Sequence, residues 1–257
     1  MFRPCIDLHE GKVKQLVGAT LGDSPGQLRT NFVSDRPATW YAELYKRDRL
    51  AGGHVIMLGP GNETEARAAL AAYPGGLQVG GGITAENAPS WLAAGASHVI
   101  VTSWIFREAR IGWDRLKTLA ALIGKQRLVL DLSCRRCGDD YLVTTDRWKN
   151  VSQFAVNAEN LAQLAAHCAE FLVHAVEVEG LCRGIDKALV CKLAACAPIP
   201  TTYAGGASSL EDLDEVTRLG QGKIDLTIGS ALDIFGGTGV RYDDVVAFNR
   251  RLRPTQS

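Results

Sequence analysis

Short apolar runs alternate along the whole chain with longer segments whose apolar residues recur every three or four positions. The short runs predict buried strands, and the longer segments predict amphipathic helices. Alternation of this kind requires parallel strands joined by crossover helices. The predicted strands are residues 2–8, 54–58, 77–80, 98–102, 127–132, 171–175, 199–204 and 224–229. The predicted helices are residues 39–50, 63–72, 85–94, 113–123, 158–169, 186–195, 208–219 and 243–252.

Eight strand–helix units in 257 residues match the size of a single closed (β/α)₈ barrel, the TIM-barrel fold. Alternation alone also permits a doubly wound open sheet. Two connections are unusually long, residues 9–34 and 133–156, and long loops in compact domains often close over ligands. The apolar residues 141–143 predict a small hairpin within the second of them.

An internal repeat favours the barrel. An aspartate, a glycine pair and a serine each occur at the end of a predicted strand and occur again about half a chain later. Duplication of a half-barrel would produce this spacing, so we expect one domain, 1–257, made of halves near 1–124 and 125–257. The repeated pairs are Asp7 and Asp131, 124 positions apart, Gly81 and Gly205, 124 apart, and Ser103 and Ser230, 127 apart.

Composition narrows the function classes. Lys plus Arg equals Asp plus Glu, at 28 each, so the formal net charge is zero, which disfavours nucleic-acid and membrane-surface partners. No apolar run reaches the roughly 20 residues that span a bilayer, and residues 1–7 lack a signal-peptide pattern. The seven cysteines suggest reduced thiols in a cytoplasmic compartment. The lone CxxC at Cys134 and Cys137 has no second pair, which disfavours zinc.

Residues 80–84 and 204–208 place glycines between a strand and a helix, where backbone amides can approach an anion closely. Thr84 and Ser208 are the expected helix N-caps. Two such loops, each partnered by a serine after the next strand, predict two phosphate sites facing each other across the barrel mouth. The alternative is that the glycines only shape tight turns. The predicted phosphate-binding residues are Gly81, Gly82, Thr102, Ser103, Gly205, Gly206, Gly229 and Ser230.

Asp7 and Asp131 end predicted strands within apolar runs, so both carboxylates should lie over the barrel centre. Two carboxyl groups with different environments can act as an acid and a base on one substrate. The alternative is a pair of capping or salt-bridging aspartates. His174 and Glu179 at the end of strand six, and Trp148 in the long loop, could contact a ligand or serve only in packing.

Seven stretches in order cover nearly the whole chain and carry a family resemblance. They read CIDLHEGKVKQ, HVIMLGP, LQVGGGI, DLSCR, HAVEVEGLCRGID, YAGGA and DLTIGSALD, at residues 5–15, 54–60, 77–83, 131–135, 174–186, 203–207 and 225–233. The chain resembles the phosphoribosylformimino-aminoimidazole-carboxamide ribotide isomerases of histidine biosynthesis, in their eukaryotic-type branch.

The resemblance implies an Amadori rearrangement of an aminoaldose to an aminoketose, on a small ribonucleotide substrate with a phosphate at each end. It implies that Asp7 is the general base at C2 and that Asp131 is the general acid at the ring oxygen. Trp148 resembles a loop aromatic that stacks on ligand, and Arg135 lies in a matching stretch as a possible contact. Both steps are proton transfers, so we expect no metal and no cofactor.

The sequence departs from the bacterial-type pattern at four positions. Gln15 and Thr84 replace arginines, His174 replaces a threonine, and Glu179 replaces an aspartate. Glu179 could therefore share or replace the acid role of Asp131.

The rival functions are the related imidazole-glycerol-phosphate cyclase, whose lysine context residues 13–18 do not match, and a non-catalytic phosphometabolite-binding barrel. Activity on phosphoribosylanthranilate as a second substrate stays open. We expect a monomer, because the barrel needs no partner to complete either site.

Overall fold

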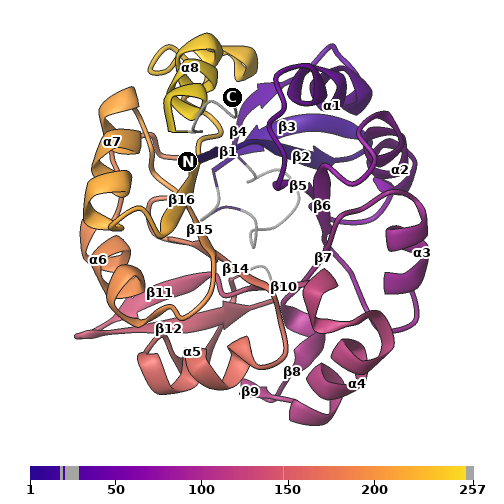
Figure 1. Cartoon of the computed structure of the whole chain (residues 1–257), viewed down its shortest axis with the longest axis vertical. Helices are drawn as coiled ribbons and strands as arrows, with labels where there is room; N and C mark the ends of the chain where they lie inside the picture. Colours follow the sequence, from indigo (N-terminus) through magenta and orange to yellow (C-terminus); the bar gives the residue numbers. More distant parts are fainter. Residues whose placement is uncertain (18–19, 21–28, 147, 253–257) are drawn as a thin grey trace, which may run out of the picture.

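The computed structural model describes residues 1–17, 20, 29–146 and 148–252. Within these residues a ring of parallel strand segments is surrounded by eight α-helices (Figure 1). The barrel strands are β1 (Phe2–Arg3), β2 (Cys5–His9), β5 (Gly53–Met57), β6 (Leu77–Gly80), β7 (Val99–Val101), β10 (Leu128–Asp131), β14 (Glu170–His174), β15 (Thr201–Ala204) and β16 (Ile224–Thr227). The helices are α1 (Ala38–Arg47), α2 (Glu63–Ala72), α3 (Ala88–Ala93), α4 (Trp113–Ile123), α5 (Ala158–Ala165), α6 (Lys187–Cys196), α7 (Leu210–Leu219) and α8 (Tyr242–Leu252).

The first strand closes the sheet. Pro4 has no N–H group and divides this strand into β1, which pairs with β16, and β2, which pairs with β5. Neighbouring strands connect the two segments in the order β16, β15, β14, β10, β7, β6 and β5. The predicted (β/α)₈ barrel is therefore confirmed, and the open sheet is excluded. The division into halves near 1–124 and 125–257 stays a prediction.

The long connections fold as additional strands. The expected hairpin in 133–156 is confirmed as a three-stranded sheet of β11 (Cys134–Cys137), β12 (Asp140–Thr145) and β13 (Asn150–Ala155). Residues 9–34, for which no strands were expected, contain β3 (Lys12–Leu16) and β4 (Thr30–Val33), which extend the barrel sheet. A short hairpin of β8 (Phe106–Arg107) and β9 (Arg110–Ile111) was also not expected. The β3–β4 and β8–β9 pairs are antiparallel, and each follows the carboxyl end of a barrel strand.

The expected N-caps are wrong for two of the helices. The cap of α3 is Asn87, whose Oδ1 accepts the Thr84 amide at 2.9 Å, so the helix begins later than Thr84 implied. The cap of α7 is Ser209 in a capping box, and Asp212 Oδ2 accepts the Ser208 amide at 2.7 Å. In both loops a side chain at or near the start of the helix, Asn87 or Asp212, accepts a hydrogen bond from a backbone amide just after the glycine turn.

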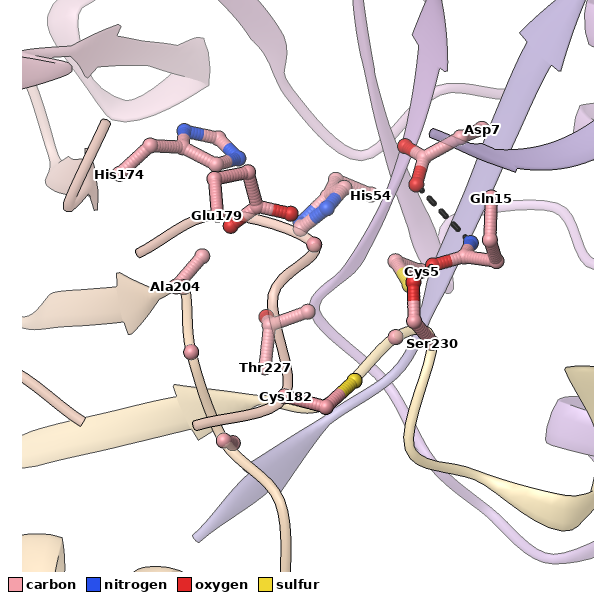
Figure 2. A pocket seen from close by; sticks show the side chains of 15 residues that line it. Cys5, Asp7, Gln15, His54, His174, Glu179, Cys182, Ala204, Thr227 and Ser230 are labelled. Atoms are coloured by element: carbon pink, nitrogen blue, oxygen red, sulfur yellow. Dashed lines mark hydrogen bonds between the residues drawn. The ribbon is translucent and has the colours of Figure 1, made fainter. Parts of the chain in front are cut away.

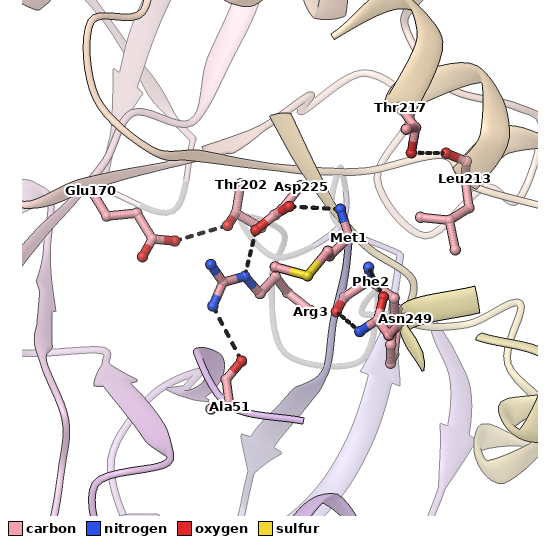
Figure 3. Close-up of polar contacts among 10 residues, drawn as sticks. All are labelled: Met1, Phe2, Arg3, Ala51, Glu170, Thr202, Leu213, Thr217, Asp225 and Asn249. Atoms are coloured by element: carbon pink, nitrogen blue, oxygen red, sulfur yellow. Dashed lines mark hydrogen bonds and ion pairs between the residues drawn. The ribbon is translucent and has the colours of Figure 1, made fainter. Parts of the chain in front are cut away.

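Polar groups fill the end of the barrel where the strands begin (Figure 3). The Arg3 guanidinium donates through Nε to Asp225 Oδ2 at 2.7 Å, and the amino group of Met1 donates to Asp225 Oδ1 at 2.7 Å. The Glu170 carboxylate accepts from the Thr202 hydroxyl at 2.8 Å. Each charge in this network has a partner, as buried charges require. This end of a (β/α)₈ barrel serves stability, and the opposite end carries the chemistry.

Replacing Asp225 with asparagine should lower the free energy of unfolding by about 3 kcal/mol, because Arg3 and the amino terminus would then lose the carboxylate that they share. Asp140→Asn is the matched control, since Asp140 pairs with Lys192 at 3.1 Å but its side chain is 62% exposed. That pair should contribute less than about 1 kcal/mol. Equal losses in the two variants, measured by denaturant unfolding, would contradict the assigned role.

Candidate functional site

A pocket opens at the mouth of the barrel, where strands β2, β14, β15 and β16 end (Figure 2). Its walls combine carboxylates and imidazoles with glycine-containing turns, so it offers both proton-transfer groups and backbone amides. The lining residues are Cys5, Asp7, Gln15, His54, His174, Glu179, Gly180, Cys182, Ala204, Gly205, Gly206, Ala207, Thr227, Gly229 and Ser230.

Asp7 lies on β2 and accepts a hydrogen bond from Gln15 Nε2 at 3.0 Å (Figure 2). Burial raises the pKa of this carboxyl to about 7, and the charge of Glu179 adds to the rise. The charge of His174 and the Gln15 bond act in the opposite direction. Asp7 therefore exchanges its proton near neutral pH, as a general base must.

Asp131, at the end of β10, is held in its ionised form. Its Oδ1 accepts the Ser133 amide at 2.9 Å and the Ser133 hydroxyl at 2.8 Å, and it lies 3.4 Å from His174 Nδ1. Burial acts to raise the pKa of Asp131, but the His174 charge and these hydrogen bonds outweigh it and lower the pKa below its ordinary value. The two aspartates of the repeat thus differ in protonation behaviour.

His174, the last residue of β14, is the only imidazole in the described pocket lining that is kept cationic. Burial acts to lower its pKa, but the Asp131 carboxylate outweighs this, with smaller contributions from Glu179 and Asp7, and raises the pKa to about 9. Its ring also lies near those of His54 and Trp148, with centroids 6.1 and 6.2 Å away. Burial, together with the charge of His174, lowers the pKa of His54 to about 3, so His54 is neutral.

Glu179 follows β14 and points into the pocket beside His174 (Figure 2). Its Oε2 is buried and has no hydrogen-bond partner in the described part of the chain. Burial raises its pKa, the His174 charge opposes this, and the Asp131 charge adds to it. An unpaired buried carboxyl of raised pKa can carry a proton and donate it to a ligand.

The glycine turns have the backbone shape that the sequence predicted. Gly81, Gly82, Gly205 and Gly206 have φ values of 94°, 69°, 119° and 77°, a region that favours glycine. A Cβ at Gly206 would lie 2.2 Å from the Gly184 carbonyl oxygen, whereas one at Gly82 would meet nothing within 4 Å. The repeated turns therefore share a conformation but differ in how closely other backbone approaches them.

The pocket brings together half of the predicted site. Asp7, with the possible contacts His174 and Glu179, shares it with the predicted phosphate residues of the second half, which are Gly205, Gly206, Gly229 and Ser230. The remaining predicted residues do not line it. They are Gly81, Gly82, Thr102, Ser103, Asp131, Arg135 and Trp148.

Two of these outlying residues are nevertheless tied to the site. Trp148 packs near the His174 ring, and Asp131 bonds to His174, so both reach the pocket through one side chain. Ser103 Oγ accepts the Asp146 amide at 3.1 Å and lies in a separate hollow beside the β12–β13 turn. Arg135 lies on β11, paired with Leu142. Their predicted roles stay predictions.

Sequence analysis missed three polar residues of the pocket, His54, Thr227 and, as a functional group, Gln15. Each is less than 7% exposed although it is polar and lies within a strand. A polar residue inside an apolar strand run is a signal for an inward-facing site, since buried polar groups need partners. That signal was available for His54 and Thr227, but it does not say which ligand they face.

The family model for histidine biosynthesis proteins matches residues 1–238, most of the chain. The chain belongs to this family. A relative from Neurospora crassa is 53% identical over 97% of this chain and 98% of its own length. One from Saccharomyces cerevisiae is 47% identical over 97% of this chain and 98% of its own length. One from Medicago truncatula, named as chloroplastic, is 51% identical over 98% of this chain and 82% of its own length.

All three relatives are named as isomerases of 1-(5-phosphoribosyl)-5-((5-phosphoribosylamino)methylideneamino)imidazole-4-carboxamide. The family inferred from the sequence motifs, including its eukaryotic-type branch, is therefore confirmed by fungal and plant members of the family.

The described residues show no metal site, no disulfide at the CxxC pair and no membrane-spanning helix. No group of three or more His, Cys, Asp or Glu side chains there is placed to hold a metal ion. Of the CxxC pair, Cys134 is buried and Cys137 is exposed, and neither forms a disulfide. No helix in the described ranges has the length and hydropathy needed to cross a membrane.

The two repeated turns give a matched test of the glycine requirement. Gly206→Ala should lower the free energy of unfolding by more than about 2 kcal/mol, because a Cβ there adds a clash with Gly184 to the strain of its positive φ. Gly82→Ala should cost only the backbone strain, roughly 1 kcal/mol. Thermal unfolding of both variants measures the difference, and an equal or larger loss for Gly82→Ala would contradict the closer packing assigned to Gly206.

Proposed function

We propose that this chain is the isomerase that converts the phosphoribosylformimino ribonucleotide of its relatives' names from the aminoaldose to the aminoketose form, in histidine biosynthesis. The observation that carries this proposal is the pocket itself. It places an aspartate of near-neutral pKa and an unpaired buried glutamate beside the Gly205–Gly206 turn. These are a base, an acid and an anion-binding turn in one cavity, which is what proton transfer on a phosphorylated sugar requires.

Ring opening and enaminol formation each need a proton transfer. An acid protonates the ring oxygen of the ribose, the C1–O bond breaks, and the lone pair of the neighbouring nitrogen forms a C=N bond to C1. A base then removes the proton from C2, the electrons of the C–H bond form a C1–C2 double bond, and the C=N π electrons return to nitrogen. The enaminol becomes the aminoketose when C1 gains a proton and the C2 hydroxyl loses its own.

We assign the base to Asp7 and, between the two acids that the sequence left open, favour Glu179. Asp131 Oδ1 already accepts two hydrogen bonds from Ser133 and faces a cationic His174, so its anionic form is stabilised. Glu179 Oε2 has no such partner among the described residues, and burial favours its neutral form. In this assignment Asp131 positions His174 and fixes its charge.

Phosphate binding at Gly205, Gly206, Gly229 and Ser230 orients the sugar. Binding of the phosphate, which does not react, thereby speeds the reaction of the ribose. The second anchor, at Gly81, Gly82, Thr102 and Ser103, and the stacking role of Trp148 belong to the same proposal. So do a monomeric state, a cytoplasmic location and the absence of nucleic-acid partners. Light scattering on the purified protein tests the first of these three.

Asp7→Asn should lower kcat by about 10²- to 10⁴-fold while leaving substrate affinity within about tenfold, because it removes the base and keeps the shape. In the unsubstituted enzyme kcat/KM should fall as the pH drops below about 7, where Asp7 becomes protonated and cannot accept a proton.

A steady-state assay on the ribonucleotide across pH 5–9, with phosphoribosylanthranilate as a second substrate, makes both measurements. Thermal unfolding of the same variant shows whether it is folded. A carboxyl whose folded pKa is raised destabilises the protein once it ionises, so Asp7→Asn should unfold at the same or a higher temperature at pH 8. Near-normal turnover would refute the assignment of Asp7.

The acid assignment is tested by comparing Glu179→Gln with Asp131→Asn. Glu179→Gln removes the proposed donor and should lower kcat by about 10²-fold or more at every pH. Asp131→Asn keeps the donor and removes only the partner that holds His174 in its cationic form, so kcat should fall less than in Glu179→Gln. A greater loss of kcat in Asp131→Asn, with Glu179→Gln nearly active, would return the acid role to Asp131.

A further inference from the structure

Two buried side-chain oxygens have no hydrogen-bond partner in the described residues, Glu179 Oε2 and Thr227 Oγ1. Both residues line the same pocket (Figure 2). Leaving a buried polar atom unpaired costs stability, so an unpaired atom that lines a pocket is a candidate partner for a ligand. Glu179 already has a proposed role, but Thr227 has none.

Other buried threonine hydroxyls of the barrel strands are satisfied within the protein. Thr202 donates to the Glu170 carboxylate at 2.8 Å, and Thr201 donates to the Ile199 carbonyl at 3.0 Å. Thr227 differs although it is only 6% exposed. Its free hydroxyl therefore reflects its position at the pocket and not a general property of threonines in these strands.

Thr227 lies where two strands lead into the glycine-containing turns of the pocket. It is the last residue of β16, beside Ala204 of β15, and the two strands continue directly into the turns at Gly205–Gly206 and Gly229–Ser230. Figure 2 shows Thr227 between Glu179 and Cys182. The unpaired hydroxyl therefore shares the pocket with the proposed acid and with both proposed anion-binding turns.

The part of a phosphorylated sugar that lies between its phosphate and its reacting carbon is a chain of hydroxyl-bearing carbons. A threonine hydroxyl can both donate to and accept from a sugar hydroxyl. We propose that Thr227 is a specificity-determining residue that hydrogen-bonds a sugar hydroxyl of the phosphate-bearing ligand. This rests on the proposed function for the class of ligand, but not for the reaction.

The test compares Thr227→Val, which keeps the shape and removes the hydroxyl, with Thr227→Ser, which restores it. Ribose 5-phosphate and inorganic phosphate serve as competitive probes, because only the first carries sugar hydroxyls. In Thr227→Val the inhibition constant of ribose 5-phosphate and the KM of the ribonucleotide should rise roughly three- to tenfold. Inhibition by inorganic phosphate should change less than about twofold, and Thr227→Ser should stay close to the unsubstituted protein.

Thermal unfolding separates a binding role from a structural one. The ligand-free Thr227→Val variant loses no protein hydrogen bond, so its melting temperature should be unchanged or higher. Thr202→Val is the matched control, because it breaks the bond to Glu170 at the opposite end of the barrel. This control should unfold at a lower temperature and bind ribose 5-phosphate as the unsubstituted protein does.

Four results would overturn the proposal. They are unchanged ribose 5-phosphate binding in Thr227→Val, an equal weakening for inorganic phosphate, a lowered melting temperature, and no binding of ribose 5-phosphate to the unsubstituted protein. Failure of the proposed function looks different. The protein would then bind ribose 5-phosphate in a Thr227-dependent way but would not turn over the ribonucleotide.

Discussion

The burial of one imidazolium among three carboxylates governs the mouth of this barrel. His174 bonds to Asp131 and acts through its charge on Glu179 and Asp7. Because one cation cannot balance three anions in a poorly solvated site, the carboxyl that contacts it stays ionised and the others shift toward their neutral forms. The same residue types thereby acquire different proton affinities, which lets one act as an acid and another as a base.

The two ends of the barrel differ in whether their buried polar groups have hydrogen-bond partners. Where the strands begin, Asp225 accepts from both Arg3 and the amino terminus, and Glu170 accepts from Thr202. At the mouth, oxygen atoms of Glu179 and Thr227 stay unpaired among the described residues. The unpaired atoms cost stability, and the satisfied network at the other end helps the fold to tolerate that cost. A local violation of polar pairing in an otherwise consistent structure is typical of a functional site.

Sequence alone predicted the parts of this molecule that depend on local pattern. The eight strands and the eight helices follow from apolar periodicity, because each element must bury one face. Asp7 was expected to end its strand but lies in the middle of β2, which continues to His9. The contact of His174 with Asp131 joins residues 43 positions apart, and Gln15 reaches Asp7 through a strand in a connection for which none was expected. Thr84 shows the limit at short range, since Asn87 and not Thr84 is the N-cap residue of the helix, and the Asn87 side chain accepts the Thr84 amide.

The repeat predicted from the sequence is matched in backbone shape but not in side-chain environment. The turns at Gly82 and Gly206 share a positive φ, since this depends on the turn itself. The neighbours differ, so Asp7 faces a neutral Gln15 whereas Asp131 faces Ser133 and His174. In the proposed reaction only one of the two riboses of the substrate reacts. The proposal therefore requires the two aspartates to differ in charge, and their environments supply that difference.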